Sequence, residues 1–180
     1  GSLEWFAIGI AGDGQHHHQL DAAHGVVLVE VERRGRRDAA FREVGPVEAH
    51  IDHRDLVAPR LVEAGHRVRA LARNPDKISD VPWATDVEVV RGDLADPDSL
   101  DDACRGIDVV YYLVHSMGGP GEFIDTERRG AENLVAAARR AGVGRIVYLG
   151  GLHAESDRLS THLRSRSQVG EILLNSGVPT

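Results

Sequence analysis

Apolar and polar residues follow two different periods along the chain, and from about residue 55 onward the two periods alternate. Apolar residues at helical spacing predict four helices, at 55–65, 97–104, 122–141 and 161–176. Alternating or nearly continuous apolar runs predict four strands, at 67–72, 87–91, 107–114 and 145–149. Strands and helices in this order are typical of an α/β fold with a parallel sheet.

Residues at the ends of these segments support two of the helices. Asp55 is a candidate N-cap and Gly65 a stop for the first helix, in which Pro59 is tolerable only within the first turn. Asp96 followed by Pro97 is a typical start for the second helix. Cys104 falls on the apolar face of that helix, which predicts a core role for it and no chemistry.

The first 54 residues do not share this alternation. "GVVLVEVE", residues 25–32, predicts one strand, while the flanking "GDGQHHHQ" and "ERRGRRD" have the composition of loops. We therefore expect two parts, an unassigned divergent segment at 1–54 and a partial domain at 55–180.

Composition narrows the classes of function. The 180 residues are 42% hydrophobic and 27% charged, as in ordinary globular domains, and the net charge of −7 disfavours nucleic acids or an anionic membrane as partners. A single cysteine excludes an internal disulfide and fits a reducing compartment. No apolar run approaches the roughly 20 residues of a membrane span, and no signal-peptide pattern opens the chain, so we expect a soluble, cytoplasmic protein.

Two groups of histidines could hold a metal, but neither completes a known ligand spacing with a carboxylate or a cysteine. A solvated loop is the preferred interpretation, and no metal is expected. The histidines concerned are His16, His17, His18, His24, His50 and His53.

Four stretches, in this order and spacing, carry a resemblance to a known family: "LVEAGHRVRALARNPDK", "VEVVRGDLADPDSLDDACRGIDVVYYLVHSMG", "AENLVAAARRAGVGRIVYLGG" and "HLRSRSQVGEILLNSGVPT". They resemble the short-chain dehydrogenase/reductase superfamily, and within it the atypical, NmrA-like NAD(P)-binding branch. The resemblance covers about 125 of the 180 residues. It implies a Rossmann-like doubly wound parallel sheet, incomplete at both ends, whose ligand crevice lies at the carboxyl ends of the strands.

The resemblance assigns expected cofactor contacts to the ends of two strands. Arg73 follows the second strand of such a fold, where a basic residue suits the 2′-phosphate of NADP, and Lys77 is nearby. NADP is therefore the expected cofactor, with NAD as the alternative. Asp93 resembles the adenine-edge contact of the family, with Leu94 packing beside the ring. The competing interpretation is that Arg73 and Lys77 are solvated turn residues and that Asp93 is a turn residue that bonds its own backbone.

The end of the central strand is expected to line the same crevice. The backbone of Tyr112, Leu113 and Val114 would border the nucleotide whether or not their side chains take part. His115 and His153, at strand ends facing the crevice, are reserve candidates for catalysis.

Most reductases of the family use a tyrosine and, four residues later, a lysine; the matching positions here hold His162 and Arg166. His162 would be a general acid or base, and the permanent charge of Arg166 would favour its neutral ring. A surface or capping role for His162 is at least as well supported, since a lone helical histidine is weak evidence for catalysis. The serine usual after the preceding strand is replaced by Gly150 and Gly151.

The glycine-rich turn of the family, which lets the backbone approach the diphosphate, is missing. The equivalent stretch reads "PVEAHIDHRDL", and it brings the carboxylates of Glu48, Asp52 and Asp55 in place of glycines. We therefore do not expect tight cofactor binding from this stretch. A family fragment with an altered start, from a shifted reading frame or recombination, would explain the loss of resemblance near Asp55.

Three functions remain open. The leading one is an NADP-preferring oxidoreductase acting on a small molecule of unknown identity. The second is a non-catalytic, dinucleotide-sensing regulatory module, as the lost tyrosine and lysine would imply. The third is a fragment that binds no nucleotide. The sequence does not specify the oligomeric state.

Overall fold

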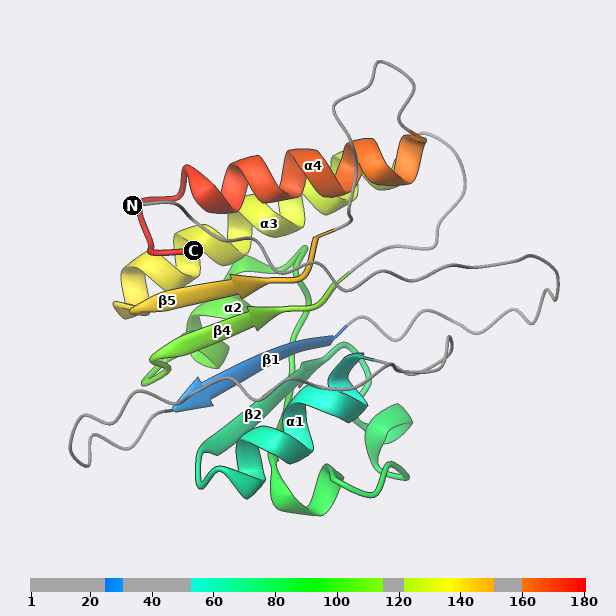
Figure 1. Ribbon diagram of the computed structural model, residues 1–180, viewed down its shortest axis with the longest axis vertical. Coiled ribbons are helices and arrows are strands. Elements are labelled where there is room, and N and C mark those ends of the chain that lie inside the picture. Colours follow the sequence, from blue (N-terminus) through cyan, green and yellow to red (C-terminus); the bar gives the residue numbers. More distant parts are fainter. Residues whose placement is uncertain (1–24, 31–52, 115–121, 151–159) are drawn as a thin grey trace, which may run out of the picture.

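The structure is a computed structural model, and it describes residues 25–30, 53–114, 122–150 and 160–180 (Figure 1). Every structural statement below concerns these residues. Within them, no helix is both long enough and apolar enough to cross a membrane.

Five strands and four helices alternate along the chain, and they confirm the predicted elements with small changes at their ends. The strands are β1 (Gly25–Glu30), β2 (Arg67–Ala72), β3 (Glu88–Arg91), β4 (Val109–Tyr112) and β5 (Arg145–Tyr148). The helices are α1 (His53–Glu63), α2 (Pro97–Cys104), α3 (Glu122–Ala141) and α4 (Thr161–Leu174).

The two predicted helix starts have different outcomes. Asp96 caps α2 as expected, because its side chain accepts a hydrogen bond from the Asp98 N–H at 3.2 Å. The N-cap expected at Asp55 is wrong, since α1 begins at His53 and includes Asp55 in its first turn. Pro59 consequently lies beyond that turn, where it cannot donate to the Asp55 carbonyl. α1 ends at Glu63, and Gly65, the predicted stop, follows it with a positive φ of +86°.

The strands form one sheet in the order β3-β2-β1-β4-β5. This is the order of a doubly wound fold, with β1 in the position of its central strand. β2 pairs in parallel with β3, and β4 with β5, but β1 is antiparallel to both of its neighbours. The parallel arrangement that the sequence predicts therefore holds for β2, β3, β4 and β5, and β1 departs from it.

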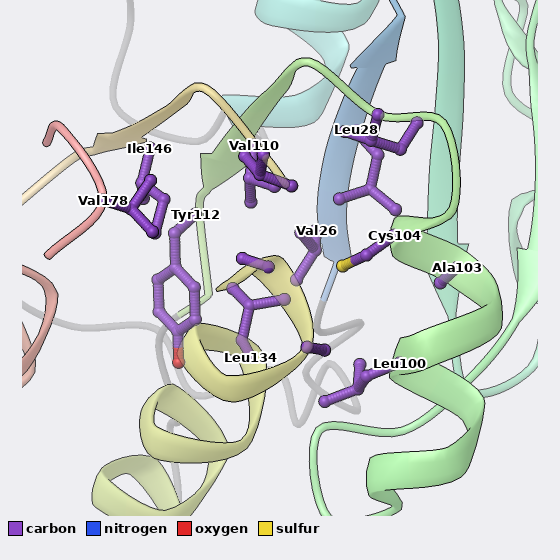
Figure 2. Close-up of a cluster of buried hydrophobic side chains, with 14 of the residues drawn as sticks. Val26, Leu28, Leu100, Ala103, Cys104, Val110, Tyr112, Leu134, Ile146 and Val178 are labelled. Atoms are coloured by element: carbon purple, nitrogen blue, oxygen red, sulfur yellow. The ribbon is translucent and has the colours of Figure 1, made fainter. Parts of the chain in front are cut away.

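β1 corresponds to the strand predicted at 25–32, and it lies in the sheet between β2 and β4. Val26 and Leu28 are 2% and 0% exposed, so the strand lies within the core (Figure 2). An apolar strand of this kind is stable where other elements cover both of its faces and where a strand pairs with it on each side. The position between β2 and β4 meets both requirements. The segment up to residue 54 is thus partly integrated in the sheet.

Two hydrophobic clusters lie on opposite faces of the sheet. The larger one packs β1, β4 and β5 against α2, α3 and α4, and Figure 2 shows its central residues, including Leu100, Val110, Leu134 and Ile146. The smaller one packs β2 against α1 and the turns that follow β2. Cys104 is fully buried in the larger cluster, which agrees with the core role expected for it.

Candidate functional site

The site expected from the sequence lies where β2, β3, β4 and β5 end, because strands that run in one direction present their carboxyl ends at one edge of a sheet. The residues that follow these strands are therefore neighbours along this edge, which we call the carboxyl edge. It begins with Arg73 after β2 and Gly92 after β3, and continues with Leu113 after β4 and Leu149 after β5.

The two basic residues expected to hold a phosphate are both exposed. Arg73 follows β2 directly, and Lys77 lies in a short 3₁₀ turn at Pro75–Ile78. That turn is held at both ends: the Asn74 side chain accepts from the Asp76 N–H at 3.2 Å, and Ile78 is buried in the smaller cluster. A fixed turn thus presents Lys77 to solvent four residues after Arg73.

Asp93 and Leu94 are engaged in the local structure that joins β3 to α2. Asp93 accepts from the Ala95 N–H at 2.9 Å, as in the turn role considered for it, and its own N–H donates to the Ser99 hydroxyl at 3.0 Å. The Leu94 side chain lies against Gly130 of α3, so close that a Cβ on Gly130 would be 3.1 Å from the Leu94 Cβ. The structure therefore packs Leu94 against α3, while the Asp93 turn remains at the edge.

The residues that end β4 face alternately to the two sides of the sheet. Tyr112 is 1% exposed and extends from β4 toward α3 (Figure 2). Val114 packs against the same larger cluster. Leu113 packs in the smaller cluster. The side chains of Tyr112 and Leu113 belong to the core, so any contact of these two residues with a ligand at the edge would come from their backbone.

A buried polar cluster beneath the carboxyl edge was not foreseen from the sequence. The Ser165 hydroxyl of α4 donates to the Glu127 carboxylate of α3, and the Tyr148 hydroxyl donates to the backbone carbonyl of Arg166 at 3.0 Å. The Tyr112 ring contacts the Tyr148 ring edge-on, with centroids 5.8 Å apart, and its hydroxyl has no hydrogen-bond partner among the described residues. The cluster ties the start of α4 to both α3 and β5.

One signal for this cluster was present in the sequence. Glu127 falls three residues after Ile124 and four before Ala131, on the face of α3 predicted to be apolar. A carboxylate at such a position requires a buried partner. Spacing alone does not identify that partner, because Ser165 lies 38 residues further along the chain.

The hydroxyls in this cluster stay protonated at neutral pH. Burial raises the pKa of Tyr148 to about 12, and the nearby Glu127 charge adds to the effect while Arg166 opposes it. Burial, and after it the Glu127 charge, raises the pKa of Tyr112 well above the ordinary range. Both groups are therefore hydrogen-bond donors at neutral pH and are poorly suited to act as bases.

The pair expected in place of the catalytic tyrosine and lysine lies at the start of α4. The helix is capped by the Ser160 hydroxyl, which accepts from the Leu163 N–H at 3.3 Å, and it includes both His162 and Arg166. Arg166 is half-buried; the side chain of His162 is outside the described part of the structure. The reserve candidates His115 and His153 also lie outside the described residues.

The described residues of the carboxyl edge fit the adenosine end of a nicotinamide dinucleotide but not its diphosphate. An exposed arginine directly after β2 and a fixed acidic turn after β3 suit the adenosine end with its ribose phosphate. The diphosphate normally lies against the turn that leaves the carboxyl end of the central strand. In this chain that strand, β1, runs in the opposite direction, so the described residues do not fit the diphosphate.

Comparison with known families gives a match across most of the chain. The sequence profile of a family described as NAD(P)H-binding matches residues 55–176. A (4-alkanoyl-5-oxo-2,5-dihydrofuran-3-yl)methyl phosphate reductase of Streptomyces griseus is 35% identical over 124 residues, which are 68% of this chain and 40% of the relative. A 3 beta-hydroxysteroid dehydrogenase/Delta 5-->4-isomerase of Mycobacterium tuberculosis is 36% identical over 98 residues, 49% of this chain and 26% of the relative. The chain thus spans well under half the length of these relatives.

Solved structures give a similar picture. An NADPH-dependent quinone oxidoreductase from Escherichia coli, in complex with NADPH, is 26% identical with a TM-score of 0.50, over 61% of this chain and 36% of that one. A nucleoside-diphosphate-sugar epimerase from Staphylococcus aureus is 26% identical with a TM-score of 0.52, over 60% of this chain and 37% of that one. Both likenesses cover a minor part of the longer proteins.

Proposed function

The chain belongs to the NAD(P)H-binding family, and from this premise we propose that it is the NADP-preferring nucleotide-binding part of an oxidoreductase that acts on a small organic molecule. The relatives named above include a reductase, a dehydrogenase and a quinone oxidoreductase, which favours an oxidoreductase over a regulatory, dinucleotide-sensing module. These relatives support the class of reaction alone, since the chain covers 40% or less of each.

The preference for NADP rests on Arg73. A guanidinium immediately after β2 can form paired, charge-assisted hydrogen bonds with the ribose 2′-phosphate, which NAD lacks. An acidic residue at this position would instead accept hydrogen bonds from the ribose hydroxyls of NAD. Lys77, presented by the adjacent 3₁₀ turn, adds a second positive charge beside the same phosphate.

The proposal assigns the proton-transfer role to His162, with Arg166 one helical turn further along α4. Arg166 would hold His162 in its neutral form by charge repulsion, so that the ring can accept a proton near neutral pH. Turnover of NADPH with a panel of quinones, enones and sugars should fall in His162→Ala and persist in His66→Ala, which removes a histidine from the turn between α1 and β2. Equal rates for wild type and His162→Ala would exclude this role.

Calorimetric titration with NADPH and NADH tests the cofactor preference. Arg73→Ala should weaken NADPH binding about 10- to 100-fold, because a hydrogen bond to a charged group contributes roughly 1.5–3 kcal/mol. NADH binding should stay unchanged. Arg67→Ala is the matched control, since Arg67 is an exposed arginine at the opposite end of the same strand. An equal loss for both nucleotides in Arg73→Ala would contradict the proposal.

A further inference from the structure

The buried polar cluster connects the carboxyl edge with the helix that carries the expected catalytic pair. Tyr148 is the last residue of β5, so it lies at this edge, and its hydroxyl donates to the Arg166 carbonyl of α4 at 3.0 Å. The Tyr148 ring also lies directly against α4, because a Cβ on Gly170 would be 3.4 Å from the ring. A hydrogen bond as well as packing therefore fixes α4 relative to the carboxyl edge.

A second contact holds the same part of α4 to α3, which lies beside it (Figure 1). The Ser165 hydroxyl donates to the Glu127 carboxylate, and the two residues are 1% and 8% exposed. Ser165 and Arg166 are consecutive, so neighbouring residues of α4 are bonded to two different elements, α3 and β5. Buried hydrogen bonds are directional, and they fix a helix more narrowly than apolar contacts do. Sliding α4 along its axis, or turning it, would break both bonds.

These bonds hold the part of α4 that contains the expected catalytic pair. Arg166 is a member of that pair, and His162 precedes it by about one helical turn, within the first turn of α4. Helix ends fray, so the position of the first turn depends on how the next turn is held. A displacement of about 1 Å in a catalytic group can lower a rate on the order of 100-fold. A shift of α4 would move His162 and Arg166 together relative to a ligand at the carboxyl edge.

From these contacts we infer that Tyr148, and Glu127 through its bond to Ser165, are positioning residues for proton transfer. They act through α4, by setting where His162 and Arg166 stand relative to the carboxyl edge. The inference rests on the proposed function, because it requires that His162 transfers the proton. It adds to that function a role in the reaction for residues of α3 and β5.

Steady-state oxidation of NADPH with the panel of quinones, enones and sugars tests the inference. Tyr148→Phe removes only a hydroxyl and should lower kcat about tenfold, since the loss of an ordinary hydrogen bond corresponds to roughly one factor of ten in rate. The KM for NADPH should not change, because the variant leaves Arg73 in place. Tyr111→Phe is the matched control: its side chain packs on the opposite face of the sheet, and its kcat should equal that of the wild type.

Two further comparisons separate positioning from a general loss of stability. Glu127→Leu removes the acceptor of Ser165 and should lower kcat in the same way, whereas Glu127→Gln keeps an acceptor and should retain most of the rate. In a His162→Ala background, Tyr148→Phe should cause no further loss, because its effect passes through His162. Tyr148→Phe decides the test if Glu127→Leu does not fold.

The inference and the proposed function fail in different ways. A wild-type kcat in Tyr148→Phe would overturn the inference and leave the proposed function standing. A tenfold loss that persists in the His162→Ala background, or that also occurs in Tyr111→Phe, would overturn it too, because the effect would then come from the fold as a whole. If the wild type does not oxidise NADPH with any compound of the panel, or if His162→Ala is fully active, the proposed function fails and the inference fails with it.

Discussion

The two faces of the sheet are covered in different ways (Figure 1). On one face α2, α3 and α4 pack against β1, β4 and β5 and against one another, and this layer contains the buried polar cluster of Glu127, Ser165 and the two tyrosines. On the other face α1 and the turns after β2 form a thinner layer, and the exposed Arg73 and Lys77 lie beside it.

This difference separates the residues that stabilise the fold from those expected to bind a nucleotide. A layer whose helices also contact one another is less free to move into a cavity than a single helix, which can shift toward the sheet. The thicker face should therefore be the more sensitive to loss of volume. The basic residues of the thinner face are exposed, so changing them should affect binding with little effect on stability.

The largest effect is expected from a matched pair of valine truncations, one on each face. Val110 of β4 and Val68 of β2 are 0% and 3% exposed, and they lie in the larger and the smaller cluster respectively. Val110→Ala should lower the free energy of unfolding by about 2–3 kcal/mol, and Val68→Ala by about 1 kcal/mol, because the second cavity can partly close. Urea unfolding followed by circular dichroism measures both.

Trp83 provides a local check on the same pair. Trp83 is buried in the smaller cluster together with Val68. Its fluorescence should therefore change more in Val68→Ala than in Val110→Ala. Equal losses for the two variants, or a greater loss for Val68→Ala, would contradict the claim that the α1 face relaxes more easily.

Local patterns in the sequence predict where the helices and strands lie, but they do not predict the direction of β1. β2, β4 and α3 follow from apolar spacing because each buries a face that its own residues define. The run "GVVLVE" places Val26 and Leu28 on one face whichever way the strand runs, so its pattern is the same in both directions. Its direction is set by pairing with β2 and β4, which are distant in sequence.

In the candidate site too, local sequence patterns predict some features, whereas others depend on contacts between distant segments. Arg73 was placed at the carboxyl edge from sequence, because a residue that follows a parallel strand must lie there. The packing of Leu94 against Gly130 depends on how α3 crosses the β3–α2 turn, and no local pattern specifies that crossing. The contact between Glu127 and Ser165 was missed for the same reason.

The smallest effect is expected from removing the buried charge on the thicker face while keeping its hydrogen bond. Glu127→Gln can still accept from Ser165, so the loss in unfolding free energy should be about 1 kcal/mol or less. The Glu127 charge helps to raise the pKa values of Tyr112 and Tyr148. In the variant both tyrosines should therefore ionise at lower pH than in the wild type.

Tyr111 is an internal control for this titration, because burial raises its pKa while Arg145 lowers it, and its side chain packs on the α1 face. Tyrosinate absorbance is measured as the pH is raised, and Tyr→Phe variants assign each ionisation step to its residue. In Glu127→Gln the steps of Tyr112 and Tyr148 should shift to lower pH, and the step of Tyr111 should stay where it is in the wild type. A buried tyrosine with a raised pKa destabilises the fold once the pH exceeds the usual 10.0, as the unfolded chain then ionises first. Glu127→Gln should reduce this alkaline loss of stability, and a parallel shift of all three tyrosines would instead indicate that the variant has loosened both faces of the sheet.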